Sequence, residues 1–194
     1  MTSDQSNHQG EQQVILRPAR EEDIPAIVEL VNGYAAQNLM LPRSPEEVRR
    51  TLKTWIVAEL DGRVVGCAAL ARLSPDLAEI RSLAVAADQA GKGIGGRIVQ
   101  ALVDVARREG IKQIAALTLR QSFFERQGFE VVDRWDLSPK IWSECVYCPK
   151  FHQCDEIAVA MTLVEEVEDA SRTPHGGSLH QWAWAVTPTV KASA

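Results

Sequence analysis

The sequence lacks the features of a membrane-bound, secreted or nucleic-acid-binding protein. None of its apolar runs approaches the roughly 20 residues that a membrane-spanning helix needs. The first 13 residues are polar and lack the apolar core of a signal peptide. The formal net charge is -5, so no basic excess indicates nucleic acid or an anionic membrane as a partner. A cytoplasmic location is therefore the default expectation.

Cysteine is also scarce. There are four in the chain, and in a reducing compartment they are expected to be free thiols or metal ligands rather than disulfides. Cys67 falls in the middle of an expected strand and is interpreted as a small core residue. Cys145, Cys148 and Cys154 form C-x2-C-x5-C with His152 nearby, a pattern compatible with a structural zinc site. One short loop would have to wrap the ion, however, so free thiols packing that loop are the alternative, and no catalytic metal is expected.

The composition is that of an ordinary globular protein. Of 194 residues, 45% are hydrophobic and 24% are charged, which fits one domain with a tail. Residues 1–13 and 165–194 are rich in polar and small residues and are expected to be disordered. The folded domain is therefore expected over 14–164, and the chain contains no internal repeat.

The order of expected elements is mixed α and β. Periodicity predicts a helix that starts after the acidic residues 21–23 and ends at Gly33, and Ser44 followed by Pro45 is typical of a helix cap. Asp61-Gly62 between two β-rich runs predicts a hairpin with a type I′ turn. The chain from residue 135 to 155 is expected to be irregular. The other predictions are strands at 14–17, 54–60, 63–70, 77–86, 112–119, 129–132 and 156–164, and helices at 94–109 and 122–127.

The most informative stretch is a glycine-rich loop between a strand and an amphipathic helix. Gly91, Gly93, Gly95 and Gly96 stand where the loop becomes the helix. The start of a helix has unpaired N–H groups and the positive end of the helix dipole. Glycines there allow a diphosphate to approach the backbone closely, so the loop is a candidate phosphate-binding site.

Three interpretations of this loop compete. A nucleotide P-loop fails, because Gly93 stands after Lys92 where Ser or Thr is required. The spacing also satisfies the G-x-G-x-x-G pattern of a dinucleotide fold, but residues 87–90 separate it from the strand, and the strands before it form a meander rather than βαβ units. In the third interpretation the glycines only make a tight entry into the helix.

The segments EIRSLAVAADQAGKGIGGRIV and SFFERQGFEVV resemble the central motif of the GNAT acyltransferase superfamily, a strand with a bulge, a G-x-G loop and a helix, and the helix and strand that follow it. The resemblance covers roughly residues 14–164. It implies an α+β fold in which a mixed, mostly antiparallel and twisted sheet of six to seven strands is flanked by about four helices. It also implies acetyl-CoA as the cosubstrate.

The same resemblance assigns the acetyl-CoA contacts. It implies that backbone groups of Leu83, Ala84 and Val85 hold the pantetheine arm and the acetyl carbonyl. The family usually has Gln or Arg where Ala90 stands, which removes one side-chain contact but leaves the backbone intact. The residues implied to hold the pyrophosphate are Gly91, Lys92, Gly93, Ile94, Gly95 and Gly96.

A narrower resemblance is to the short bacterial N-acetylglutamate synthase type of GNAT domain. It rests on NLMLPRSPEEV, on VGCAAL followed by DLAEIRSLAV, and on LSPKIWSECVYCPKFHQCDE. It implies acetylation of the α-amine of glutamate, the first step of arginine synthesis. The kinase domain of longer versions is absent from this sequence, and a homodimer is the expected assembly.

Acetyl transfer to an amine needs a group that removes a proton from the ammonium. Glu79 is the candidate base, since on an alternating strand it would share a face with Arg81, Leu83 and Val85. The alternative is a solvent-facing glutamate. No Ser, His and Asp set indicates a covalent route, so direct attack on the thioester is preferred.

Two further roles need candidates. Phe124 stands where many GNAT members have a tyrosine that acts as the general acid, so Ser122, Thr118 or unassisted departure of the thiolate are the alternatives. A dicarboxylate substrate requires guanidinium or ammonium partners. The candidates are Arg43, Arg81 and Lys140, of which Arg43 and Arg81 rank first.

Two other functions stay open. One is a GNAT enzyme for another small amine or for a protein N-terminus. The other is a non-catalytic acetyl-CoA-binding module.

Overall fold

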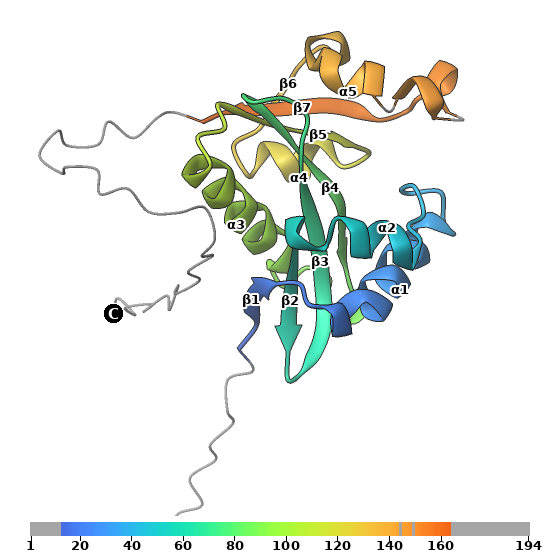
Figure 1. Cartoon of the computed structure of the whole chain (residues 1–194), viewed down its shortest axis with the longest axis vertical. Coiled ribbons are helices and arrows are strands. Elements are labelled where there is room, and N and C mark those ends of the chain that lie inside the picture. The colour runs from blue at the N-terminus through green and yellow to red at the C-terminus, as the bar shows by residue number, and fades with distance from the viewer. Residues whose placement is uncertain (1–12, 144, 149, 164–194) are drawn as a thin grey trace, which may run out of the picture.

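The computed structural model describes residues 13–143, 145–148 and 150–163, which form one sheet with helices on both faces (Figure 1). The terminal segments expected to be disordered lie outside these residues, apart from Gln13. The domain limits at 14 and 164 therefore stay a prediction.

The sheet has seven strands in the order β1-β2-β3-β4-β5-β7-β6. All neighbours are antiparallel except β4 and β5, which are parallel and connected by a crossover through a helix. This confirms the expected α+β class and the mostly antiparallel mixed sheet. The strands are β1 (Ile15–Pro18), β2 (Trp55–Leu60), β3 (Arg63–Arg72), β4 (Leu77–Val85), β5 (Gln113–Thr118), β6 (Glu130–Val131) and β7 (Ile157–Thr162).

The hairpin between β2 and β3 turns where the sequence predicts it. Asp61 has a φ of 51° and Gly62 a φ of 77°, so both central residues are left-handed, as a type I′ turn requires. β4 then follows β3 antiparallel, which completes the expected meander.

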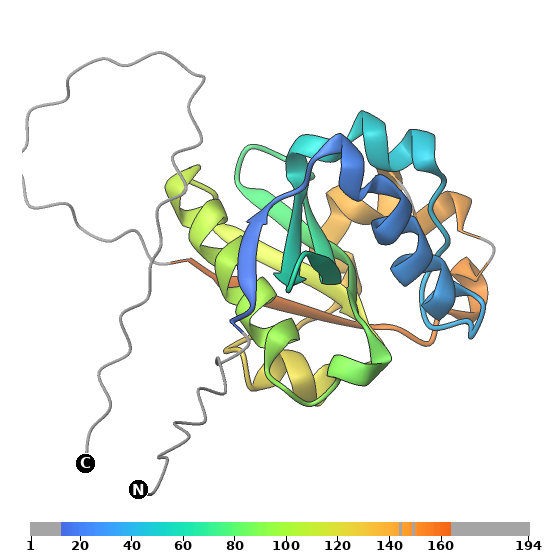
Figure 2. The ribbon, with the colours of Figure 1, turned by 90° about the horizontal axis from the view of Figure 1, so that it is seen from below.

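Helices cover both faces of the sheet, as Figures 1 and 2 show from two directions. The apolar stripe of α3 (Ile94–Arg108), which includes Ile98 and Leu102, is fully buried against one face of β2, β3 and β4. Gly66 on β3 lies under this helix, and a Cβ there would come within 2.9 Å of Ile98 Cδ1. The α-helices are α1 (Ile24–Ala35), α2 (Pro45–Arg50), α3 (Ile94–Arg108), α4 (Gln121–Glu125) and α5 (Ser138–Ser143).

The opposite face of the sheet is shared by two groups of helices. Ile27 and Val31 of α1 and Val48 of α2 pack on the β2–β3 side of this face. Leu137, directly before α5, packs on Leu77 of β4 and on neighbouring alanines of β5 and β7. Residues from both groups of helices and from β4 line a common cavity.

Two local predictions are wrong. Gly33 does not end the first helix, because α1 continues to Ala35 and so includes Tyr34. The segment expected to be irregular contains α5 and three short 3₁₀ helices (Arg134–Leu137, Cys145–Tyr147 and Phe151–Gln153). Both errors concern residues that line the candidate site.

Candidate functional site

The site begins where two parallel strands separate. β4 and β5 are paired from Leu77–Gln113 to Glu79–Ala115, and beyond that point both strands continue without pairing to each other. The backbone groups that face this opening are not used by the β4–β5 ladder. They are therefore available to a ligand that lies between the strands.

A bulge in β4 marks the same place. Ser82 has a φ of 51°, and the register with β3 shifts between Cys67–Ala84 and Ala69–Arg81. An extra residue reverses the alternation of side chains. Ile80 and Leu83 therefore both face the core under α3.

This reversal corrects one sequence-based expectation. Glu79 and Arg81 share a face, as expected, but Leu83 and Val85 point to the other face of the sheet. The GNAT motif that the sequence resembles includes a bulge in this strand. The prediction that Leu83 and Val85 share a face with Glu79 assumed unbroken alternation and did not take the bulge into account. Ala84 packs beneath α1 beside Cys67.

The glycine loop forms one end of the site, which we call the glycine-loop end. Gly91 and Gly93 have φ values of 79° and 76°, a conformation that side chains strongly disfavour. Gly93 is the N-cap of α3, and no side chain caps this helix start. The first N–H groups of a 15-residue helix are therefore directed at the cavity with their positive potential, which suits a phosphate.

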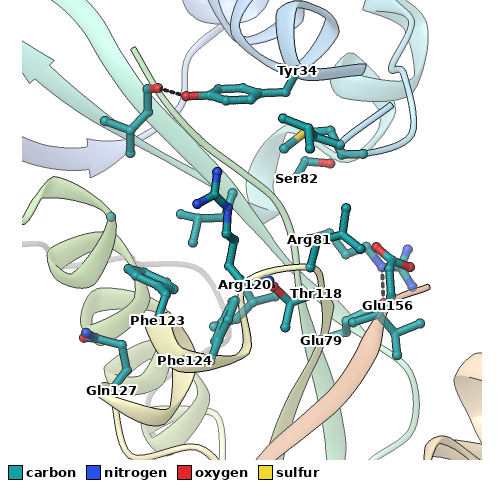
Figure 3. Close-up of a pocket in the computed structure, with 18 of the residues that line it drawn as sticks. Tyr34, Glu79, Arg81, Ser82, Thr118, Arg120, Phe123, Phe124, Gln127 and Glu156 are labelled. Atoms are coloured by element: carbon teal, nitrogen blue, oxygen red, sulfur yellow. Dashed lines mark hydrogen bonds and ion pairs between the residues drawn. The ribbon is translucent and has the colours of Figure 1, made fainter. Parts of the chain in front are cut away.

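The next two glycines allow close packing around this end. A Cβ on Gly95 would lie 3.4 Å from the Phe123 ring, and one on Gly96 would lie 3.0 Å from the Gln127 side chain. Figure 3 shows Phe123 and Gln127 together at this side of the site. Lys92, expected among the pyrophosphate contacts, donates from Nζ to Gln89 Oε1 at 3.0 Å and so braces the loop.

One cavity of about 1120 Å³ connects this loop to the opening between β4 and β5. It is large for a small-molecule site, so it has room for a long cofactor-sized ligand and a second molecule. Four arginines that the sequence analysis did not propose as site residues add positive charge to the lining of this cavity. They are Arg97, Arg120, Arg126 and Arg134.

Tyr34 also lines this cavity. Its hydroxyl donates a 2.5 Å hydrogen bond to the Val85 carbonyl, which joins α1 to the end of β4 (Figure 3). Because the sequence predicted a helix ending at Gly33, this contact was not anticipated.

Charged side chains form the other end of the cavity, which we call the charged end: Arg43, Glu79, Arg81, Lys140 and Glu156. Glu79 is only 4% exposed, and its Oε2 accepts from Arg81 Nε at 2.5 Å and lies 3.0 Å from Lys140 Nζ. Two cations thus hold a buried carboxylate in one orientation. The alternative of a solvent-facing glutamate is wrong.

Arg43 reaches the charged end from the loop before α2. The Asn32 side chain holds this loop by donating to the Arg43 carbonyl at 3.0 Å and accepting from the Arg43 N–H at 2.9 Å. The Arg43 guanidinium donates to Ser82 Oγ at 3.3 Å, at the bulge. Arg43 thus contacts the bulge residue next to Arg81, and both arginines line the cavity as candidates for carboxylate recognition.

Of the two candidates for a general acid, Thr118 ends β5 and lines the cavity, whereas Ser122 is exposed on α4 and is not among the lining residues. Phe124 is buried, with edge-to-face contacts to Phe123 and Phe129 at centroid distances of 5.1 and 5.2 Å. Thr118 lines the cavity, and its Oγ1 accepts from the Arg120 N–H at 2.9 Å, which leaves the hydroxyl proton to be donated elsewhere. Thr118 therefore remains a candidate donor, whereas Phe124 has no proton to give.

The cysteines separate into a core residue and a group at the cavity. Burial raises the pKa of the Cys67 thiol to about 12, in agreement with its interpretation as a core residue. Cys145, Cys148 and Cys154 are free thiols that line the cavity. Burial raises the pKa of Cys145, and the negative charge of Glu79 adds to this while Lys140 opposes it. Within the described residues no group of three metal-binding side chains is placed to hold an ion, so the zinc hypothesis gains no support.

Comparison with known proteins decides the family. Residues 23–129 match the Acetyltransferase (GNAT) family, which is more than half of the chain. The chain belongs to the GNAT acetyltransferase family. As a GNAT protein it is an acetyl-CoA-dependent N-acetyltransferase, and acetyl-CoA is its cosubstrate.

Two relatives illustrate the similarity. An uncharacterized N-acetyltransferase of Chlorobaculum tepidum, CT2212, is 40% identical over 76% of this chain and 96% of its own. The amino-acid acetyltransferase of Mycobacterium tuberculosis is 37% identical over 67% of this chain and 76% of its own.

Solved structures agree with this GNAT assignment. Rv2747 from Mycobacterium tuberculosis in complex with CoA and NLQ has a TM-score of 0.69 and 32% identity, over 77% of this chain and 99% of that one. N-acetylglutamate synthase from Neisseria gonorrhoeae, complexed with coenzyme A and N-acetyl-glutamate, has a TM-score of 0.69 and 27% identity. The match covers 79% of this chain but only 36% of the Neisseria chain. In the part of our chain that is described, no helix is long and apolar enough to cross a bilayer.

Proposed function

We propose that this GNAT enzyme transfers the acetyl group of acetyl-CoA to the α-amine of an amino acid, with L-glutamate as the acceptor. The observation that carries the proposal is the single cavity that joins the glycine-loop end to the charged end. A diphosphate fits the first, and an acceptor that carries both an ammonium and carboxylates fits the second. The names of the relatives support an amino-acid acceptor.

At the glycine-loop end, the N–H groups from Gly91 to Gly96 bind the pyrophosphate of acetyl-CoA. The pantetheine arm then lies between β4 and β5, where strand pairing stops after Glu79. Backbone groups of Leu83, Ala84 and Val85 hold the arm and the acetyl carbonyl at the bulge. An N–H directed at that oxygen would stabilise the negative charge that develops during attack.

At the charged end, Arg43 and Arg81 bind the two carboxylates of glutamate. The arrangement also balances charge. Three cations (Arg43, Arg81 and Lys140) face two carboxylates (Glu79 and Glu156), and glutamate as a zwitterion carries one net negative charge. A guanidinium is suited to this task because it pairs with carboxylates in a defined geometry.

The reaction is a direct attack. Glu79 removes a proton from the ammonium, and the free amine attacks the acetyl carbon to form a C–N bond and a tetrahedral intermediate. The C–S bond then breaks, and its electron pair leaves on sulfur. The nitrogen gives up its second proton to solvent or, where Thr118 has protonated the sulfur, to Thr118, which leaves the neutral amide. Because a thiol is already fairly acidic, the thiolate can depart without help or take a proton from Thr118.

The test is thiol release from acetyl-CoA by the full chain across a panel of amino acids and small amines. We expect turnover with L-glutamate, and clearly less with glutamine and aspartate, which lack one carboxylate or place it differently. Turnover with a non-amino-acid amine alone would reassign the acceptor. Binding of acetyl-CoA without turnover of any acceptor would favour a non-catalytic module. Participation in arginine synthesis, a cytoplasmic location and a homodimer stay predictions.

A further inference from the structure

Glu156 is a second acidic residue at the charged end, and the sequence did not single it out. It precedes β7, and its side chain lines the cavity beside Glu79 and Arg81 (Figure 3). The pairing of Ile157 with Thr118 places it at the open end of β5, close to where β4 and β5 separate. Ala158, two residues further along in β7, packs on the α5 side of the sheet, the side from which Lys140 reaches Glu79.

The two glutamates at this end differ in their partners. Glu79 Oε2 is engaged by Arg81 and Lys140. Glu156 forms no ion pair with any of the residues that the structure describes, and its polar contact is Cys154 Sγ at 4.0 Å. A partly buried carboxylate without a cation is unfavourable, and a second carboxylate nearby makes it more so.

The charges around Glu156 also make its ionised form unfavourable. Burial raises the pKa of Glu156, and the negative charge of Glu79 raises it further. Lys140 from α5 and Lys150 act in the opposite direction, while Asp155 adds to the rise. Arg81 on β4 and the Cys154 thiol also face this region. A positively charged group entering the cavity would relieve the cost of ionising Glu156.

We propose that Glu156 binds the α-ammonium of the acceptor and holds it beside Glu79 for deprotonation. This inference rests on the proposed function and divides the work between two carboxylates. An ammonium has three N–H donors, so it can bond both glutamates at once. Glu156 then contributes to acceptor binding, while Glu79 contributes to the chemical step.

The test is two-substrate kinetics of thiol release with L-glutamate, comparing the wild type with Glu156→Gln. Loss of a charge-assisted hydrogen bond is expected to raise the KM for glutamate about 10- to 100-fold. The KM for acetyl-CoA should change less than about two-fold and kcat only about three-fold, since the thioester site and Glu79 are untouched. Glu130→Gln is the matched control, because that carboxylate is exposed on the edge strand β6 and is not among the groups that act on Glu156.

The pH dependence of the KM for glutamate distinguishes binding of the ammonium by Glu156 from a merely structural role of this residue. Below its raised pKa, Glu156 is neutral and attracts the ammonium less, so the wild-type KM for glutamate should rise as the pH falls through that pKa. Glu156→Gln should lack this rise, and Glu156→Asp should retain it. The inference would be overturned if Glu156→Gln had the wild-type KM for glutamate and the same rise of that KM at low pH. The proposed function would still stand.

A binding measurement keeps the inference testable without turnover. If the wild type acetylates no amino acid, the proposed function fails. Calorimetric titration of L-glutamate into the CoA-bound chain then decides the role of Glu156. Binding at least about 10-fold weaker in Glu156→Gln supports it, and equal or absent binding in both proteins contradicts it.

Discussion

The two ends of the cavity offer a ligand different kinds of chemical groups. The glycine-loop end relies on backbone: left-handed glycines at Gly91 and Gly93 and an uncapped helix start. The charged end relies on side chains from distant elements, with Arg43 before α2, Glu79 on β4 and Lys140 on α5. A backbone site tolerates changes in most side chains, whereas a side-chain site can change its ligand by a single substitution. The difference suggests that cosubstrate choice is fixed by the fold and acceptor choice by a few residues.

The largest effect is expected from Glu79→Gln. Removing a general base should lower kcat about 10²- to 10⁴-fold, with the KM for acetyl-CoA changed little. Steady-state thiol release measures this. Glu130→Gln on the exposed edge strand β6 is the control and should match the wild type. A near-normal kcat in Glu79→Gln, in a protein that melts at the wild-type temperature, would remove Glu79 from the chemistry.

Arg43→Ala should act on the acceptor alone. Loss of a guanidinium–carboxylate pair is expected to cost about 1.5–3 kcal/mol of binding, or about 10- to 150-fold in the KM for glutamate. The control is Arg49→Ala, since Arg49 is exposed on α2 and pairs with Glu21 at the surface. If Arg43→Ala instead weakened acetyl-CoA binding, the division between the two ends would be wrong.

Gly93→Ala should act on acetyl-CoA alone. A side chain at a φ of 76° costs about 1–2 kcal/mol, and relief of this strain would distort the helix start. We expect the KM for acetyl-CoA to rise about 10-fold while the KM for glutamate stays the same. Gly33→Ala is the control, because Gly33 lies within α1 with open space around it, and alanine there should slightly stabilise the fold. An equal effect of both substitutions would show that the glycine loop has no special role.

The smallest effect is expected from Phe124→Tyr, which introduces the hydroxyl that many GNAT members have. Phe124 lies between two aromatic rings, and a thiolate leaves readily without a proton donor. The value of kcat should change less than about three-fold. A rise of 10-fold or more would show that protonation of the leaving sulfur limits the reaction.

The backbone site was largely predictable from the sequence. Glycine spacing, the Asp61-Gly62 turn and the meander of β2, β3 and β4 depend on local rules, and the structure agrees with each of them. Sequence patterns alone were therefore enough to propose a phosphate-binding loop, and the resemblance to GNAT proteins narrowed the phosphate to the pyrophosphate of acetyl-CoA. The assignment of individual contacts to its residues stays a prediction.

The charged end was predictable only in part. Glu79, Arg81 and Arg43 were proposed from motifs, but Glu156 and Tyr34 were not, because their roles depend on contacts between elements far apart in the chain. The bulge at Ser82 also altered which side chains share a face. Short helices between β6 and β7 carry no strong periodicity, so α5 and the placement of Lys140 beside Glu79 emerged only from the fold.

The most direct test of the central claim is one set of two-substrate kinetics with acetyl-CoA and L-glutamate for the wild type, Gly93→Ala and Arg43→Ala. The account predicts glutamate-dependent thiol release, with Gly93→Ala raising only the KM for acetyl-CoA and Arg43→Ala raising only the KM for glutamate. No glutamate-dependent release by the wild type, or the same KM altered by both substitutions, would contradict it.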